Sequence, residues 1–144
     1  MRRAVTIAIL LFVACKKGDP IANVIHDIEK AADDRDASAI VEKLATNYAD
    51  DIGGRREAEE NLKRYFLGYK SVDVSISDLQ TWQSGPTAQA RFVANFNGTA
   101  REIGGLDQLL PSSAKYKFDV WLAQEGGEWK ITNAKWEAVG RGEV

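Results

Sequence analysis

The side chains that could carry acid–base chemistry in this sequence are few, and their spacing favours solvent exposure. His26 is the single histidine. It lies opposite the apolar stripe of an amphipathic segment, so we expect it to face water. Asp50 and Asp51 follow a short extended stretch around Tyr48. Because adjacent side chains of an extended chain point to opposite faces, at most one of these aspartates can face a core, and we interpret the pair as a solvated strand end. One exposed histidine excludes a Ser–His–Asp arrangement, and we predict no catalytic residue.

Sites for metals, phosphates and nucleic acids also lack the residues they need. The chain has one cysteine and one histidine, whereas protein metal sites combine several such ligands at regular spacing. The paired glycines at 104–105 and 126–127 are typical of a loop and a hairpin turn. The formal net charge of −2 provides no basic field for nucleic acid. We therefore expect no metal, no cofactor and no nucleic-acid partner.

The N-terminus has the pattern of an export signal. Arg2 and Arg3 precede an uncharged apolar run over residues 4–13. That run falls short of the roughly 20 residues that a helix needs to span a bilayer, and its length is typical of a signal peptide. A polar segment, Lys16–Pro20, follows at once.

The four residues Phe12-Val13-Ala14-Cys15 resemble the bacterial lipobox, with Phe12 where that motif usually has leucine. The resemblance implies a signal peptide over residues 1–14, a cysteine acylated at its sulfur, and a lipidated tether over residues 15–20. Removal of residues 1–14 would leave a net charge of about −4. We expect a bacterial cell-envelope location, at the outer membrane or the periplasmic face rather than in the cytoplasm. An ordinary cleavable signal with an incidental cysteine, or a short anchor helix, is the alternative.

The rest of the chain changes its apolar period near residue 70. Before that point apolar residues recur every three to four positions, and after it every second position, which is typical of helices and then of half-buried strands. Asp19 is a suitable helix N-cap, with Pro20 at the first helical position. The pattern predicts helices over residues 21–32, 37–44 and 55–69, an extended piece around Tyr48, and strands over 72–77, 88–96, 116–122 and 128–139. It predicts turns at 85–86 and 126–127, and a turn or a bend at 97–98.

The last predicted strand contains a change of phase. Trp129 and Ile131 occupy odd positions, whereas Ala134 and Trp136 occupy even ones. A strict strand would place the two sets on opposite faces. A β-bulge near Thr132 or Asn133 would bring them onto one face, and we predict such a bulge.

Helices followed by a meander of strands predict one α+β domain, a curved antiparallel sheet wrapped around N-terminal helices. Over residues 21–140 this layout resembles the nuclear transport factor 2-like superfamily, the cystatin-like cone fold shared by ketosteroid isomerases and polyketide cyclases. Four passages carry the resemblance: residues 28–40, 48–51, 55–66 and 127–131. It implies a conical cavity between the sheet and the helices, and a convex face that forms dimers.

The resemblance implies a pocket near five aromatic residues: Tyr48, Tyr65, Phe92, Phe118 and Trp136. Aromatic stripes at strand spacing are more often core than ligand site, so we expect these side chains to fill the cone; a ligand pocket is the alternative. On the opposite face Trp121, with Val93 and Trp82, could form an apolar patch for homodimerisation. The alternative is a tryptophan lying flat against long neighbouring side chains.

Function is the least constrained property. Enzymes of this superfamily need an acid or base inside the cone, and the inward positions of the three long strands carry neither a carboxylate nor a histidine, while Asp73 and Asp119 alternate to the other face. We therefore expect a lipid-anchored envelope protein with a non-catalytic domain that binds a small apolar ligand or a protein partner. The alternative is a periplasmic isomerase- or cyclase-like enzyme with its site in the cone.

Overall fold

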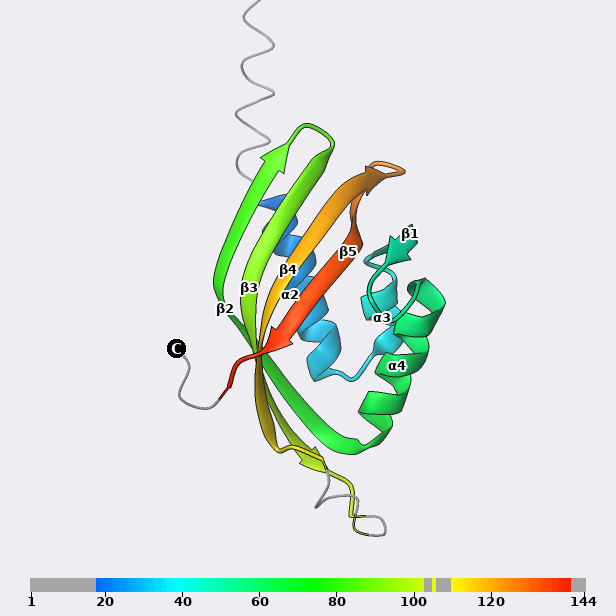
Figure 1. Cartoon of the computed structure of the whole chain (residues 1–144), viewed down its shortest axis with the longest axis vertical. Coiled ribbons are helices and arrows are strands. Elements are labelled where there is room, and N and C mark those ends of the chain that lie inside the picture. The colour runs from blue at the N-terminus through cyan, green and yellow to red at the C-terminus, as the bar shows by residue number, and fades with distance from the viewer. Residues whose placement is uncertain (1–17, 103–104, 106–109, 141–144) are drawn as a thin grey trace, which may run out of the picture.

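The computed structural model describes residues 18–102, 105 and 110–140. The predicted signal peptide and Cys15 lie outside these residues. The described elements are α2 (Pro20–Asp33), α3 (Ala37–Val41), β1 (Leu44–Ala49), α4 (Arg55–Leu67), β2 (Tyr69–Ser84), β3 (Thr87–Ala100), β4 (Ser113–Glu125) and β5 (Glu128–Ala138). Figure 1 shows the helices gathered on the concave side of a strongly curved sheet. The predicted α+β class is confirmed.

The first helix begins as the sequence predicts. The Asp19 side chain accepts hydrogen bonds from the backbone N–H groups of Ile21, at 2.9 Å, and Ala22, at 3.3 Å, and Pro20 opens the helix. Ile21 and Ile25 are almost completely buried, so the apolar stripe of α2 faces the sheet.

Two helix ends differ from the prediction because strand pairing overrides the local pattern. The second helix ends at Val41, since Leu44 already pairs with Ile131 in β5. The third helix ends at Leu67, and Tyr69 begins β2 with its side chain fully buried. Leu44 and Tyr69 therefore contribute their side chains to the core from strands rather than from helices.

The sheet has the strand order β1-β5-β4-β3-β2. The β2–β3, β3–β4 and β4–β5 pairs are antiparallel, whereas β1 runs parallel to β5. The sheet is therefore mixed, and the antiparallel arrangement expected from sequence holds for its last four strands. A parallel pair has no connecting hairpin, so no local signal marks this pairing.

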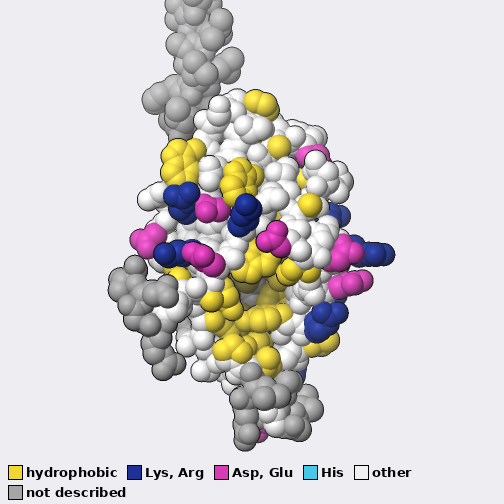
Figure 2. Space-filling view, viewed as in Figure 1, with side chains coloured by type: hydrophobic (Ala, Val, Ile, Leu, Met, Phe, Trp, Pro, Cys, Tyr) yellow, Lys and Arg dark blue, Asp and Glu magenta, His cyan; other side chains and the backbone are white. Residues whose placement is uncertain are grey.

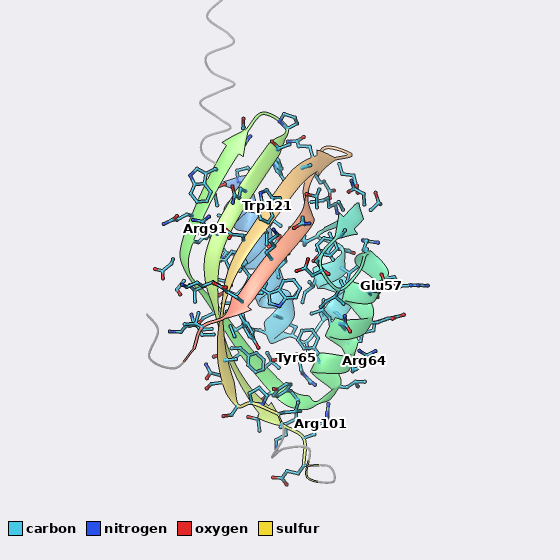
Figure 3. All side chains as sticks on the ribbon, in the orientation of Figure 1. Glu57, Arg64, Tyr65, Arg91, Arg101 and Trp121 are labelled. Atoms are coloured by element: carbon cyan, nitrogen blue, oxygen red, sulfur yellow. The ribbon has the colours of Figure 1, made fainter. Side chains whose placement is uncertain are left out.

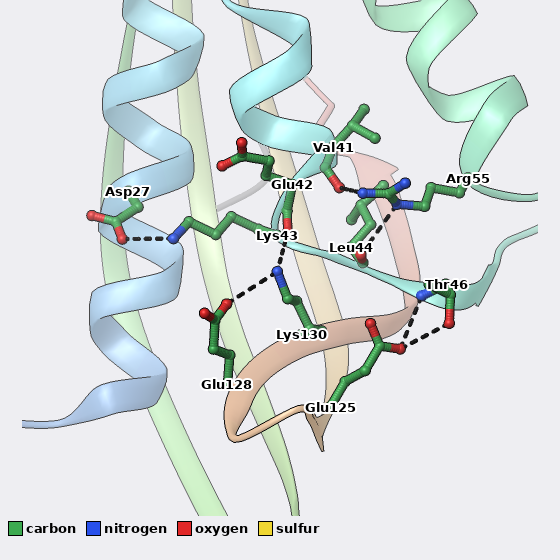
Figure 4. A network of polar contacts seen from close by, with 10 residues as sticks. All are labelled: Asp27, Val41, Glu42, Lys43, Leu44, Thr46, Arg55, Glu125, Glu128 and Lys130. Atoms are coloured by element: carbon green, nitrogen blue, oxygen red, sulfur yellow. Dashed lines mark hydrogen bonds and ion pairs between the residues drawn. The ribbon is translucent and has the colours of Figure 1, made fainter.

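A short polar network fixes β1 against its neighbours (Figure 4). Arg55, at the start of α4, donates to the carbonyl oxygens of Val41, at 3.0 Å, and Leu44, at 3.3 Å. The backbone N–H and the hydroxyl of Thr46 both donate to Glu125, at 3.1 and 2.9 Å. These contacts join α3, α4, β1 and the β4–β5 hairpin around one edge of the sheet.

The predicted bulge in β5 is confirmed. Trp121 pairs with Asn133 and Leu122 pairs with Ile131, so Thr132 is the extra residue. A second irregularity in β2, between Ser77 and Gln80, contains Asp78 with a φ of 55°. Bulges bend a strand and increase its twist, and these two account for part of the curvature of the sheet.

Of the turn or bend predicted at Asn97-Gly98, the turn is wrong, because both residues lie inside β3. A Cβ atom on Gly98 would approach the rings of Phe96, at 2.7 Å, and Tyr69, at 2.8 Å. The glycine is needed there because two aromatic rings cover its backbone. By contrast, the predicted hairpin turn at Gly126-Gly127 is confirmed, with φ values of +60° and +83°.

Buried apolar residues form two clusters. The larger one joins α2, β1 and the inner faces of β3, β4 and β5, and the smaller one joins α3, the end of α4, and the strands β2 and β3 near Tyr69. Among the described residues, no helix combines the length and the apolar character required to cross a membrane.

Candidate functional site

A cavity of about 420 Å³ lies between the helices and the concave face of the sheet. Figure 2 shows it as a hollow surrounded by hydrophobic side chains in the lower half of the molecule. Three partly exposed apolar side chains line it, Ile52 at 58%, Trp136 at 40% and Tyr65 at 36% relative exposure. Its volume lies within the range of small-molecule sites.

One wall of the cavity is a row of stacked aromatic rings. Phe92 pairs with Phe118, and Phe118 pairs with Trp136, across three neighbouring strands. The ring centroids of the first pair are 5.1 Å apart at 8°, and those of the second pair are 5.8 Å apart at 28°. The row presents a flat apolar surface to the cavity. All five predicted pocket residues, Tyr48, Tyr65, Phe92, Phe118 and Trp136, line it.

The expectation that side chains fill the cone is wrong, and the reason lies in the rows beside the aromatic one. Ala94 lies between Ile76 and Tyr116 in one row. Ala90, Val120 and Ala134 share the other. Ala94 and Ala134 keep the period of a strand, and their small side chains leave open the space that they line. Periodicity reports which face a residue occupies, not how much space it fills.

Tyr48 and Asp50 place a polar pair at the cavity wall. The Tyr48 hydroxyl donates to Asp50 Oδ2, while Asp50 Oδ1 accepts from the backbone N–H groups of Ile52, at 2.8 Å, and Gly53, at 3.1 Å. Burial, together with the hydrogen bond and the charge of Asp50, raises the pKa of Tyr48, so its hydroxyl stays protonated. Asp51 is exposed, in keeping with the predicted solvated strand end, whereas Asp50 lines the cavity, which that interpretation did not predict.

Glu29 is a cavity residue that the sequence analysis missed. Its periodicity predicts a solvent-facing side chain, yet it lines the cavity wall. Its Oε2 atom accepts from the backbone N–H of Ile76, at 2.8 Å, and its Oε1 atom lies 3.0 Å from Nδ1 of the exposed His26. Asp33 accepts from Val74 N–H in the same way, at 2.6 Å. Both carboxylates cover the free edge of β2. The sequence pointed to this role only indirectly, because a long edge strand needs groups that cover its unpaired backbone.

Two further polar side chains of the cavity, Asn61 and Tyr65, also have partners. Asn61 accepts from Arg64 at 2.9 Å. Burial and a hydrogen bond to Tyr69 raise the pKa of Tyr65, and the Tyr69 hydroxyl donates to the carbonyl oxygen of Pro111 at 2.7 Å. Most of the lining side chains are apolar, so the cavity offers a ligand mainly apolar contact.

Metal chemistry has no support in residues 18–102, 105 and 110–140, which contain no group of three or more histidine, cysteine, aspartate or glutamate side chains placed to hold an ion. His26 is exposed, with 54% of its side chain accessible, as predicted.

The outer face of the sheet carries the predicted interface residues in an interrupted pattern. Trp82 and Trp121 lie in one cross-strand row with Gln89 between them. The next row contains an ion pair, Arg91 Nε to Asp119 Oδ1 at 2.7 Å, and Val93 lies beyond it. Lys135 and Arg91 lie over the rings of Trp121 and Trp82, at 6.0 and 5.7 Å. Figure 3 shows Trp121 and Arg91 side by side on this face. The three predicted residues therefore do not form a continuous apolar patch.

No protein-family model matches the sequence. No curated protein matches it either. Solved structures do match. A proposed scytalone dehydratase from Novosphingobium aromaticivorans is 11% identical and aligns with 87% of this chain and 85% of its own, at a TM-score of 0.73.

Two further solved structures are similar to this chain to the same degree. A proposed dehydratase of the NTF2-like family from Streptomyces avermitilis is 12% identical over 85% of this chain and 96% of its own, at a TM-score of 0.72. An NTF2-like superfamily protein from Salmonella enterica serovar Typhimurium is 14% identical over 86% and 92%, at 0.69. At these identities the likeness concerns the fold alone. The described domain has the nuclear transport factor 2-like fold.

Proposed function

We propose that this chain is a lipid-anchored protein of the bacterial cell envelope whose cone-shaped domain binds a small, flat, largely apolar molecule without transforming it. The observation that carries the binding function is the 420 Å³ cavity with its row of stacked rings. A ligand on this row would displace water from aromatic surface, and each Å² of apolar area removed from water contributes roughly 25 cal/mol.

The hydrogen bonding of the wall supports binding rather than catalysis. A carboxylate has about four acceptor sites, and a general base needs one of them directed at the substrate's proton. The three carboxylate and amide side chains of the wall, Glu29, Asp50 and Asn61, each accept from a partner within the protein. The strand residues that form the rest of the wall add no carboxylate.

A dye titration tests the binding function. All described helices and strands lie in residues 18–140, so a chain that begins at Gly18 retains both apolar clusters. We expect a neutral naphthylamine dye to bind it with saturable fluorescence. Ala94→Phe fills the cavity and should weaken binding about tenfold or more, since a filled pocket leaves no apolar area to cover. Ala123→Phe, on the outward side of β4, is the control and should leave binding unchanged. Equal binding by both variants would contradict the proposal.

The lipid anchor rests on the arrangement of residues 2–15, two arginines, an uncharged run and a small residue before Cys15. Expression in a bacterium fed labelled palmitate should mark the wild-type protein and leave Cys15→Ser unmarked. An unmarked wild type would refute the anchor while leaving the cavity proposal untouched.

The Tyr48–Asp50 pair supports a second candidate, an enzyme that moves a proton. Two structures with this fold are described as proposed dehydratases, and Tyr48 supplies a hydroxyl that stays protonated next to a carboxylate in the cavity. Deuterium exchange at the α-carbon of a bicyclic ketone such as β-tetralone tests this candidate. Acceleration by the wild type and not by Asp50→Asn would favour the enzyme; exchange at the buffer rate in both would argue against it.

A further inference from the structure

The first described residues are joined to the β2–β3 hairpin. Asp19, the N-cap of α2, accepts a hydrogen bond from the hydroxyl of Thr81 near the end of β2. Figure 1 shows the start of α2 beside the upper part of β2 and β3, where their hairpin closes. Any membrane anchor that precedes Asp19 by a few residues therefore brings this hairpin close to the bilayer.

The tether from the proposed anchor is short. Cys15 precedes Asp19 by four residues, and a fully extended chain spans at most about 14 Å over that interval. That reach is less than half the thickness of a bilayer's hydrocarbon core, which is about 30 Å. The domain cannot tumble freely at a distance from the membrane, so one part of its surface must lie next to the lipid.

Trp82 is placed to occupy that contact. It follows Thr81 directly, and 47% of it is exposed. The Arg91 guanidinium lies 5.7 Å from its ring centroid, so an indole and a cation are paired on the surface. Tryptophan is enriched at the level of lipid headgroups, where its ring contacts both apolar and polar groups.

The hairpin itself lacks charge. Residues 79–90 contain no aspartate, glutamate, lysine or arginine, in a chain that is 28% charged. The β4–β5 hairpin differs, because it carries Glu125 and Glu128 on either side of its turn. An uncharged tip can approach a headgroup layer without the cost of desolvating ions, whereas an acidic tip is repelled by anionic lipid.

We propose that the β2–β3 hairpin, with Trp82 at its outer face, rests on the phospholipid surface and acts as a second membrane contact beside the acyl anchor. This inference rests on the lipid anchor proposed above. It gives the domain a defined orientation, because the hollow in Figure 2 lies in the lower half of the molecule, away from this hairpin. The cavity then takes its ligand from the aqueous compartment and not from the bilayer.

Fluorescence quenching by brominated lipid tests the orientation. The full-length protein, exported and processed in a bacterial host, is reconstituted into vesicles of phosphatidylethanolamine and phosphatidylglycerol, with or without bromine in the upper acyl chains. Trp82→Phe removes the reporter but keeps an apolar ring. Trp136→Phe is the matched control, since Trp136 is similarly exposed, at 40%, but lines the cavity.

We expect bromine to remove a similar amount of tryptophan fluorescence from the wild type and from Trp136→Phe. In Trp82→Phe the amount removed should be smaller by about twofold or more, because the indole at headgroup depth is then missing. Equal quenching in both variants, or a loss confined to Trp136→Phe, would overturn the orientation. If Trp82 is instead covered by a second copy of the chain, light scattering of the detergent-solubilised protein gives a dimer, and bromine quenches Trp82→Phe and the wild type equally. That result also overturns the proposed orientation. A protein mass without acyl chains would overturn the anchor and this inference together, whereas an acylated protein with unquenched Trp82 overturns only this inference.

Discussion

Asp19 connects two parts of the molecule through one carboxylate. One oxygen caps α2, and the other accepts from Thr81 in β2. The cap could be predicted from the dipeptide Asp19-Pro20, since its partners are local. The Thr81 contact could not be predicted, because it joins residues 62 positions apart and depends on where β2 ends. Glu29 was missed for the same reason.

Loss of this carboxylate should weaken the fold. We expect Asp19→Ala to lower the free energy of unfolding by about 1 kcal/mol, the usual value of an N-cap. Urea denaturation measures this. Asp34→Ala is the control, because the Asp34 side chain is exposed and pairs with Lys30 at 3.7 Å, and such pairs contribute about 0.5 kcal/mol or less. Equal effects would show that Asp19 has no special role.

The contribution of Asp19 should depend on pH in a defined direction. Partial burial raises its pKa, but hydrogen bonds from Thr81, Ile21 and Ala22 outweigh burial and hold the pKa below the ordinary value of 3.8. A group with a lowered folded-state pKa stabilises the protein above its unfolded pKa and loses that effect as the pH falls through the folded value. The stability difference between wild type and Asp19→Ala should therefore be constant at neutral pH and shrink below about pH 4. A difference that grows on acidification would contradict this assignment.

Arg55 is the second residue with a long-range role. It donates to two carbonyl oxygens, from α4 to α3 and β1. We expect Arg55→Ala to lower the free energy of unfolding by about 1–3 kcal/mol, because it leaves two partly buried acceptors unpaired. Arg55→Lys should recover little of the lost stability, since one ammonium group cannot reproduce the two hydrogen bonds of the guanidinium. Arg56→Ala provides the control, because the Arg56 side chain is 81% exposed. A fully stable Arg55→Ala protein would rule out the role of this network.

At the scale of elements, the sequence predicts whatever depends on neighbours along the chain. The start of α2, the turns at 85–86 and 126–127, the inward faces of the strands and the bulge at Thr132 all follow from period and turn residues. The ends of α3 and α4 and the parallel β1–β5 pair do not, because distant pairing sets them. Gly98 shows the limit clearly: Asn-Gly is a turn signal, yet this glycine lies within β3 beneath two rings.

Gly98→Ala should therefore destabilise the protein, although glycine-to-alanine changes in strands usually stabilise. A Cβ atom would lie 2.7 Å from the Phe96 ring and 2.8 Å from the Tyr69 ring, and overpacking of this kind costs about 1–3 kcal/mol. Thr99→Ala, at the adjacent exposed position, is the comparison and should change stability by less than about 0.5 kcal/mol. A thermal melt of Gly98→Ala at or above the wild-type midpoint would contradict the packing described here.

At the scale of the whole molecule, the cone has two ends of different character. The hairpin end carries the link to α2, the uncharged tip and Trp82. The hollow, with its aromatic row, lies away from it. The cavity could be located from the resemblance and from the five aromatic residues, but its open volume could not, because that volume depends on how the helices pack over small residues such as Ala94 and Ala134. Whether the cone has room for a ligand therefore depends on the packing of the helices against the sheet.

The central claim is that this hollow accepts apolar molecules, and alanine-methyl NMR of the domain from Gly18 tests it most directly. Ala94 and Ala134 line the cavity, whereas Ala123 lies on the outward side of β4. Titration with naphthalene should shift the Ala94 and Ala134 methyl signals in a saturable way, through the ring current of the bound molecule, and leave Ala123 in place. Signals that stay unchanged at saturating naphthalene, or that move equally at all three positions, would contradict the claim.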